Sequence, residues 1–282
     1  MNFNDAIQVK LGNSAEIDLI KLGNGPVIYE RIPLYVPYEF KGRSDIEHVK
    51  TMVNKTHTDL SYMFYESYNL LSVTTRNWNT SNVTTMKSMF EGSRIGSWGL
   101  DLSSFNTSKV IDMSGMFSGC LITTLDVSNF DTSQVTDMSF MFSGCELLGT
   151  LDINNWDIRN VTDIRSMFAF CNSLTSLDLS NWDTSHITSM SGMFNSCASL
   201  SSLDLSNWNT SNATSLYSMF NGCNYLKTLR LDNCDNTTIK KIMGTSTLPT
   251  GKTPNGSTRY VYCKEENFIG AAYPEGWAPK FI

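Results

Sequence analysis

Charged residues are scarce in this chain of 282 residues. Only 17% of the residues are Asp, Glu, Lys or Arg, against about 25% in an average globular protein. Apolar residues make up 41% and the net charge is -6, so the chain can bury a core and does not have the composition of a disordered protein. The acidic balance also argues against a nucleic-acid-binding protein that relies on a basic surface.

Long apolar runs, export signals and paired cysteines are also missing from the sequence. No run approaches the roughly 18 apolar residues of a membrane-spanning helix, so no membrane insertion is expected. Residues 1–23 lack the basic start and apolar stretch of a secretory signal peptide. The seven cysteines include no Cys-x-x-Cys pair, the spacing that metal sites use. We therefore predict a protein that is made and folded in a reducing cytoplasm.

Small polar residues take the place of the missing charge, because about a third of the chain is Ser, Thr or Asn. Such a composition is typical of one polar motif that is copied many times. Met-Phe pairs recur at intervals of 25 to 27 residues, and they begin at Met63, Met89, Met116, Met141, Met167, Met193 and Met219. The regular interval predicts a repeat protein.

One unit of the repeat, residues 167–192, combines two apolar patterns. Leu174, Leu177 and Leu179 have the L-x-x-L-x-L spacing of a leucine-rich repeat strand. Ile187 and Met190 then follow at offsets of three that place them on one face of a short helix. We expect one strand and one to three helical turns in each unit. The fold class is therefore an α/β solenoid, a stack of about seven strand–short helix coils.

Equivalent positions form columns along the stack. An aromatic column, expected in the core, consists of Trp78, Phe105, Phe130, Trp156, Trp182 and Trp208. The corner column that follows it is expected to cap turns, and it consists of Asn79, Asn106, Asp131, Asp157, Asp183 and Asn209. A thiol column is expected to be buried, and it consists of Cys120, Cys145, Cys171, Cys197 and Cys223. Disulfides between coils, and one between Cys234 and Cys263, are left open by the sequence.

The segments LDLSNWDTSHITSMSGMFNSC and LDVSNFDTSQVTDMSFMFSGC closely resemble the BspA-type leucine-rich repeat of bacterial surface antigens. The resemblance covers residues 57–245. It implies a solenoid and an adhesive or recognition role, and it carries no catalytic residues to transfer. Such repeats also occur in proteins encoded by phages and prophages, so the resemblance does not fix the biological setting.

The two ends of the chain depart from the repeat. In residues 1–42, two apolar segments around a repeated KLGN predict a small β-module with a hairpin; this opening is similar to that of phage structural proteins, which implies docking to a particle. A capping box at Ser44 predicts a capping helix over residues 43–56. The solenoid spans 57–245, and residues 246–282 form a C-terminal cap with a strand at 259–263 and a helix at 264–273.

An acidic column is the candidate recognition face, and it consists of Asp101, Asp126, Asp152, Asp178 and Asp204. Each of these residues lies between two apolar residues of a predicted strand, so all five should point out of one sheet. At that spacing mutual repulsion should raise their pKa values. The column could hold cations or engage a basic or glycan partner. Alternatively, it keeps an open strand face soluble.

No catalytic or metal-binding constellation emerges, so we predict a non-enzymatic protein without cofactors. The leading hypothesis is a phage virion protein (tail, fibre or head decoration), synthesised in the host cytoplasm. Its N-terminal module would dock to other virion proteins, and its solenoid would bind a host surface glycan or protein. The alternatives are a bacterial cell-surface adhesin of the BspA type and a cytoplasmic interaction scaffold. The sequence is compatible with homo-oligomers.

Overall fold

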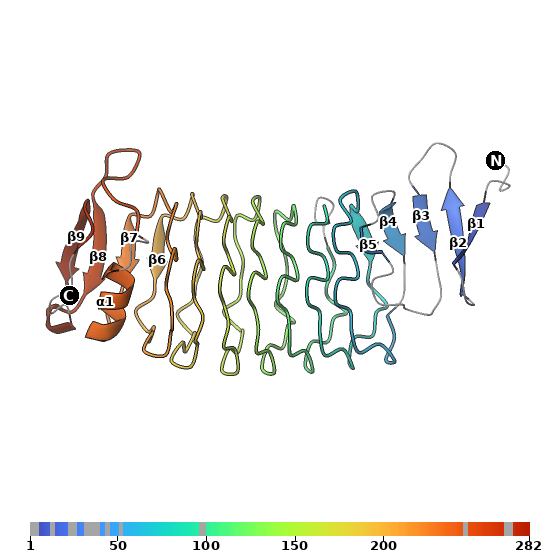
Figure 1. Ribbon diagram of the computed structural model, residues 1–282, viewed down its shortest axis with the longest axis horizontal. Coiled ribbons are helices and arrows are strands. Elements are labelled where there is room, and N and C mark those ends of the chain that lie inside the picture. The colour runs from blue at the N-terminus through green and yellow to red at the C-terminus, as the bar shows by residue number, and fades with distance from the viewer. Residues whose placement is uncertain are drawn as a thin grey trace.

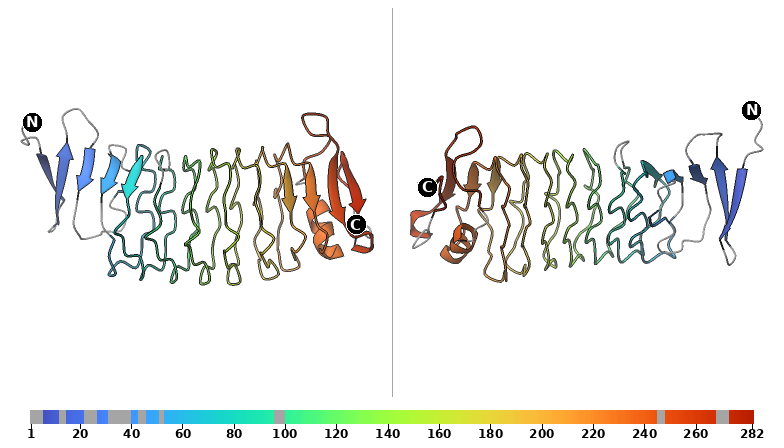
Figure 2. Two further views of the ribbon diagram at one scale, coloured as in Figure 1. Left: turned by 180° about the vertical axis from the view of Figure 1, so that it is seen from behind. Right: turned by 45° about the horizontal axis from the view of Figure 1, so that its top comes forward.

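The chain winds into a long, nearly straight stack of coils. The structure is a computed structural model, and it describes residues 6–11, 15–21, 27–30, 40–42, 46–50, 53–95, 100–244, 248–267 and 273–282. Strand β1 (Ala6–Leu11) lies at one end of the stack and strand β9 (Trp277–Phe281) at the other (Figure 1). The same course is visible from two further directions in Figure 2. A solenoid agrees with the predicted architecture.

The N-terminal strands belong to the same sheet as the first coil. β1 pairs antiparallel with β2 (Ala15–Lys21), and β2 pairs antiparallel with β3 (Val27–Glu30). β4 (Ile46–Lys50) and β5 (Ser72–Thr74) follow in parallel, so the sheet order is β1-β2-β3-β4-β5. The predicted N-terminal hairpin is confirmed, and it extends the sheet of the solenoid.

Strand β4 occupies the centre of the segment that was predicted as a capping helix, residues 43–56. The helix prediction is wrong because the stack ends in an open strand edge, and β4 satisfies its backbone groups by pairing with β3 on one side and β5 on the other. Val49 of this strand is buried, and Nδ1 of His48 lies 2.7 Å from Oγ of Ser72 on β5.

Residues 40–42 already take part in the coil stack. The ring of Phe40 stacks on the ring of Phe64 with 5.3 Å between centroids. The N–H of Gly42 donates to the carbonyl of Tyr65 at 2.7 Å, and Oγ of Ser67 donates to the carbonyl of Phe40 at 2.6 Å. The domain boundary predicted at residue 42 therefore falls inside the stack.

Tight turns, not helices, form the segment that carries each Met-Phe pair, so the predicted short helix is wrong. The N–H groups of Met141 and Ser143 donate to carbonyls three residues earlier, at 3.3 and 3.0 Å. The N–H groups of Phe140, Phe142 and Gly144 donate to the next coil, at 2.9, 2.9 and 2.7 Å. Every second amide thus bonds to a neighbouring coil, whereas an α-helix would keep these bonds within its own segment.

Two residues of every turn segment, four positions apart, have left-handed backbone conformation. They are Tyr62, Glu66, Ser88, Gly92, Gly115, Gly119, Phe140, Gly144, Ser166, Phe170, Gly192, Ser196, Ser218 and Gly222. Isolated left-handed residues do not fit into a right-handed helix. The three-residue spacings from Met190 to Met193 and from Phe194 to Cys197 are instead the period of consecutive turns, each of which places an apolar side chain inside.

The described residues between 53 and 235 contain no α-helix, and this accounts for the straight stack. An α-helix with side chains is about 10 Å wide, twice the strand spacing of about 4.8 Å, so a helix on one side would splay the coils. Here the segments that carry the Met-Phe pairs form one side of the stack, which we call the turn side. Its backbone is hydrogen-bonded from coil to coil, as in a sheet. A row of parallel bridges runs along it and joins Asp59, Thr85, Asp112, Asp137, Asp163, Ser189 and Ser215.

Aromatic rings fill the core in two ladders. The first ladder continues from Phe40 and Phe64 through Phe90, Phe117, Phe142, Phe168, Phe194 and Phe220. Its rings are nearly parallel, with 5.4 Å between Phe64 and Phe90 and 5.9 Å between Phe168 and Phe194. The predicted aromatic column forms the second ladder, and all six of its members are buried. The Met-Phe pairs are buried as well.

A column of buried threonines fastens each coil to the next beside the second ladder. Oγ1 of Thr107 donates to the carbonyl of Asp131 at 2.9 Å and accepts from the N–H of the same residue at 2.8 Å. Thr80, Thr132 and Thr184 donate to the next coil in the same way. Ile158 occupies this position in one coil. The threonines are buried because their hydroxyls satisfy backbone groups that water cannot reach.

The C-terminal end closes the stack with a second sheet and a helix. β6 (Ser202–Asp204), β7 (Thr228–Arg230), β8 (Arg259–Cys263) and β9 are parallel and lie in this order. The predicted strand 259–263 is confirmed. The helix predicted over 264–273 is present only as the 3-10 turn Glu265–Asn267, and residues 268–272 lie outside the described part.

Helix α1 (Asn236–Gly244) covers the turn side of the last coil. Asp235 caps its start, because Oδ1 accepts from the N–H of Thr238 at 2.7 Å. Nζ of Lys241 donates to the carbonyls of Thr210, Ser211 and Ala213 at 2.8, 3.1 and 3.0 Å. The helix was not predicted, and it supplies donors for carbonyls that a further coil would otherwise bond.

Substitution of Gly222 by Ala should destabilise the stack. Gly222 has φ of 77°, and a Cβ there would lie 2.9 Å from Oγ and 3.1 Å from Cα of Ser196 in the neighbouring coil. We expect a loss of about 1–3 kcal/mol in the free energy of unfolding, measured with urea. Gly149→Ala is the matched control, since a Cβ there meets nothing within 4 Å. Equal effects of the two substitutions would contradict the left-handed turn geometry.

Candidate functional site

All five aspartates of the acidic column are exposed on the strand side of the coils. Asp178, for example, lies between Leu177 and Leu179, which are both buried. The alternation of buried and exposed residues holds all five carboxylates on one face. The structure therefore places the column where the sequence predicted it. Among the described residues, regular strands occur on this face only at its two ends: up to β5, before Asp101, and from β6, which contains Asp204.

The carboxylates of this column accept hydrogen bonds from their own chain. Oδ1 of Asp101 accepts from Oγ of Ser103 at 2.6 Å and from its N–H at 2.9 Å. The hydroxyl and N–H of the serine two residues later hold the pKa of Asp101 and of Asp126 below the ordinary value. For Asp178, the N–H of Ser180, followed by its hydroxyl, lowers the pKa. The predicted rise is therefore wrong for these three, because local hydrogen bonds to the charged form outweigh solvent-screened repulsion.

Two further corners of each coil are built in the same way. In the predicted corner column the N–H of Ser185 donates to Oδ1 of Asp183 at 2.9 Å. At the corner whose residues form the row of parallel bridges, the N–H of Ser139 donates to Oδ1 of Asp137 at 2.8 Å. Asx turns of this kind stabilise a change of chain direction. Hydrogen bonding therefore does not distinguish the acidic column from these two other corners. The acidic column differs from them because it lies on the strand face.

The sign of the charge on the strand face changes at the C-terminal end. Asp204, Arg230, Tyr262 and Lys280 are paired in register across β6 to β9. Nε of Arg230 lies 3.6 Å from Oδ2 of Asp204, and its guanidinium lies 5.3 Å from the ring centre of Tyr262. Nζ of Lys280 lies 5.5 Å from the same ring. Nη2 of Arg230 also bonds to Oδ2 of Asp232, so the acidic face ends in a row that combines an ion-paired arginine, a tyrosine and Lys280.

The cysteines are free, buried thiols. Sγ of Cys145 donates to the carbonyl of Phe117 at 3.1 Å, and Cys120, Cys171, Cys197 and Cys223 donate to the preceding coil in the same way. Burial raises the pKa of Cys120, Cys171 and Cys223 to about 12. Cys234 and Cys263 are free as well. The thiols are packing residues and lack the low pKa of reactive cysteines.

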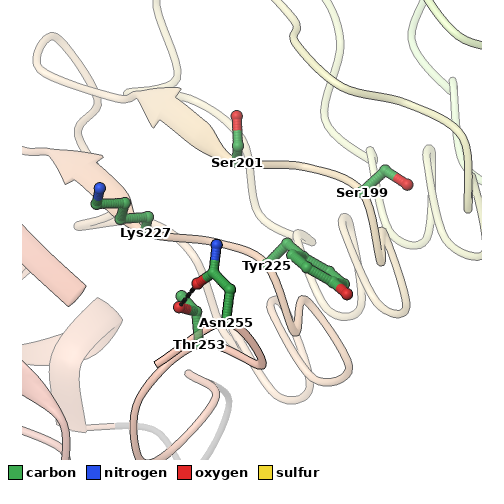
Figure 3. A pocket seen from close by; sticks show the side chains of 6 residues that line it. All are labelled: Ser199, Ser201, Tyr225, Lys227, Thr253 and Asn255. Carbon is green, nitrogen blue, oxygen red and sulfur yellow. Dashed lines mark hydrogen bonds between the residues drawn. The ribbon is translucent and has the colours of Figure 1, made fainter. Parts of the chain in front are cut away.

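A hollow of about 320 Å³ lies on the strand face where the last repeats meet the cap (Figure 3). Its lining consists of Ser199, Ser201, Tyr225, Lys227, Thr253 and Asn255. The first four residues come from two neighbouring coils, and the last two come from the loop that precedes β8. Sequence reasoning missed this pocket. The available signal was Tyr225, which occupies a position held by serine in the two preceding repeats.

Arg259 connects the two walls of this pocket from beneath. Its side chain is buried, with 2% exposed. Nε donates to the carbonyl of Gly251 at 2.9 Å, and Nη2 donates to those of Asn224 at 2.9 Å and Lys252 at 3.4 Å. Nη1 donates to the carbonyl of Leu226. The guanidinium therefore holds the backbone on both sides of Tyr225 against the loop that carries Thr253 and Asn255.

The described residues contain no cluster of three or more His, Cys, Asp or Glu side chains that could hold a metal ion. Within the same residues, neither α1 nor the 3-10 turn is long and apolar enough to span a membrane.

Comparison with known families finds matches over the repeats. Residues 58–176 and 148–246 match the family described as "Mycoplasma protein of unknown function, DUF285". Together the two matches span about two thirds of the chain. The chain belongs to the DUF285 family. Its 26-residue unit is a BspA-type leucine-rich repeat, as the sequence predicted.

Two solved structures are similar to this DUF285 protein. One is a leucine-rich repeat protein from Bacteroides ovatus, with 14% identity, a TM-score of 0.40 and coverage of 95% of this chain and 76% of that chain. The other is a leucine rich cell surface protein from Faecalibacterium prausnitzii, with 14% identity, a TM-score of 0.29 and coverage of 94% and 86%. None of the curated proteins with which the chain was compared matches it. The predicted likeness of residues 1–42 to phage proteins has no support in these comparisons.

Acidification should destabilise the DUF285 protein. The pKa is lowered for Asp101, Asp126, Asp131, Asp157, Asp178 and Asp183. Carboxylates of this kind stabilise the fold above their unfolded pKa, and the contribution is lost as the pH falls through the lower folded pKa. We expect the urea midpoint to decline from about pH 5 and to continue falling below pH 4. A rising midpoint over this interval would show that repulsion within the columns dominates.

Substitution of Arg259 by Lys should loosen the cap. A lysine cannot reproduce the planar fork that bonds four carbonyls, so we expect a loss of about 2–4 kcal/mol in the free energy of unfolding. The loop at 248–258 should also be cleaved faster in limited proteolysis. Arg159→Lys is the control, because the side chain of Arg159 is 76% exposed. An unchanged cleavage rate would show that Arg259 does not hold this loop against the coils.

Proposed function

We propose that this protein is a non-enzymatic recognition protein of a bacterial cell surface, which binds a macromolecular partner along the strand face of its solenoid. The observation that carries the proposal is the row of five exposed aspartates, which occupy the same position on the strand face of successive coils. The BspA-type repeat, which is that of bacterial surface antigens, supports the location.

The strand face offers hydrogen-bonding groups at a fixed interval. Exposed Ser residues flank Asp178 at Ser176 and Ser180, and Thr124 and Ser128 flank Asp126 in the same way. A buried ladder of rings holds each coil in place, so the face is rigid and loses little conformational entropy on binding. Groups of this chemistry suit the wet, polar surfaces of glycans and proteins.

The absence of a catalytic role is part of the proposal. The thiols are buried with raised pKa values, and the column aspartates whose pKa is shifted are exposed and more acidic than usual. Neither group is suited to act as a nucleophile or a general base near neutral pH. Binding therefore accounts better for this surface than chemistry does.

A phage virion protein was the leading prediction from sequence, and it remains an alternative without support from the comparisons. The two settings differ in where the protein is found. Proteolysis of intact cells should remove a surface protein before lysis, whereas a virion protein should be detected by mass spectrometry in purified phage particles. Detection in particles together with protection on intact cells would contradict the surface proposal. A cytoplasmic scaffold would be found in neither place.

The strand face can be tested with matched triple variants. Asp126, Asp152 and Asp178→Asn should lower binding of the labelled full chain to intact epithelial cells by roughly tenfold or more. Asp131, Asp157 and Asp183→Asn is the control, because it makes the same charge change in a column whose carboxylates also accept the N–H from two residues later. Equal cell binding by the two triple variants would show that the strand face is not the recognition surface.

A further inference from the structure

The pocket at the C-terminal end of the strand face has walls that are fixed before any ligand binds. Arg259 joins the backbone on either side of Tyr225 to the carbonyls of Gly251 and Lys252. The loop on the opposite wall is closed on itself: the N–H of Thr253 donates to the carbonyl of Ser257 at 2.9 Å, and the N–H of Gly256 donates to that of Thr253 at 2.8 Å. A preformed pocket of this volume is within the range of small-ligand sites.

Hydrogen bonds inside the loop fix the direction of the Asn255 amide. The hydroxyl of Thr253 donates to Oδ1 of Asn255, and the same hydroxyl accepts from the N–H of Ser257 at 2.9 Å. The oxygen of the amide is therefore turned toward its own loop. Its NH₂ group points toward the coils that carry Tyr225 and Lys227, as Figure 3 shows. The loop presents a donor to the pocket.

The lining combines three kinds of group. The ring of Tyr225 is about half exposed and offers a flat apolar face. Ser199, Ser201 and Asn255 offer neutral hydroxyl and amide groups. Lys227 contributes an ammonium group, and none of the six lining residues carries an acid.

We propose that this pocket binds a saccharide that carries a carboxylate, such as a sialic or a uronic acid. The carbon-bound hydrogens of a sugar ring pack on the aromatic face of Tyr225, and its hydroxyls bond to the neutral lining groups. The carboxylate accepts a charge-assisted hydrogen bond from Lys227. In the adjoining row Arg230 is ion-paired with Asp204 and Asp232, and Lys280 adds a positive charge that makes this end of the face favourable for a negative ligand.

This inference rests on the proposed function and names the class of ligand for the pocket at one end of the strand face. It can be wrong while the proposed function still holds. Titration calorimetry of the full chain compares 3′-sialyllactose and a glucuronic-acid disaccharide with neutral lactose. At least one carboxylated saccharide should bind saturably, about tenfold or more tighter than lactose, since a hydrogen bond to a charged group gives that difference. Which of the two binds identifies the source. No saturable binding of either, or lactose bound equally well, overturns the proposal.

Two variants test the assigned contacts. Lys227→Met should lower the affinity for the carboxylated saccharide by roughly ten- to a hundredfold and leave the affinity for lactose unchanged. Tyr225→Ala should lower both affinities. Lys109→Met and Tyr217→Ala are the controls, because these residues are exposed and lie outside the lining. Unchanged affinity in Lys227→Met overturns the proposal. If the saccharides do not bind while the Asp126, Asp152 and Asp178 variant still loses cell binding, this inference falls and the proposed function stands.

Discussion

Backbone hydrogen bonding between coils is the constraint on which the rest of the structure depends. Each coil must keep the strand spacing of about 4.8 Å around its whole circumference, and this excludes an α-helix from any side of the repeat. The turn side meets the constraint by alternating amides, one bonded within the coil and the next to the neighbour. That alternation demands left-handed residues such as Gly119 and Gly144, and a Cβ added at Gly144 would lie 3.4 Å from the Cα of Gly119 in the preceding coil.

The same constraint explains why Ser, Thr and Asn replace charge in this sequence. Three corners per coil need a side-chain acceptor for a nearby N–H, and short polar side chains supply it, as Asn106 and Asn209 do. Inside the stack, Thr107 and its equivalents bond to backbone that a charged residue could not approach without loss of hydration. The acidic column is the part of this polar inventory that lies exposed between the apolar residues of the strand face.

The sequence allowed the solenoid, the buried columns, the corner caps and the N-terminal hairpin to be predicted, since each rests on a local pattern repeated many times. The helix in the repeat was predicted wrongly because apolar offsets of three are shared by helices and by consecutive turns; Gly115 and Gly119, four residues apart, were the distinguishing signal. The capping helix failed because pairing with a sheet edge outweighed the capping box at Ser44. The pocket could not be predicted, because Arg259 joins segments that only the fold brings together.

Amide hydrogen exchange along the first aromatic ladder tests the account most directly. The N–H groups of Phe117, Phe142 and Phe168 each donate to a methionine carbonyl of the next coil at 2.9 Å. If the coils depend on each other through these bonds, the amides should exchange only through opening with a free energy close to that of global unfolding. Exchange as fast as that of exposed surface turns, with the protein still folded, would contradict the account.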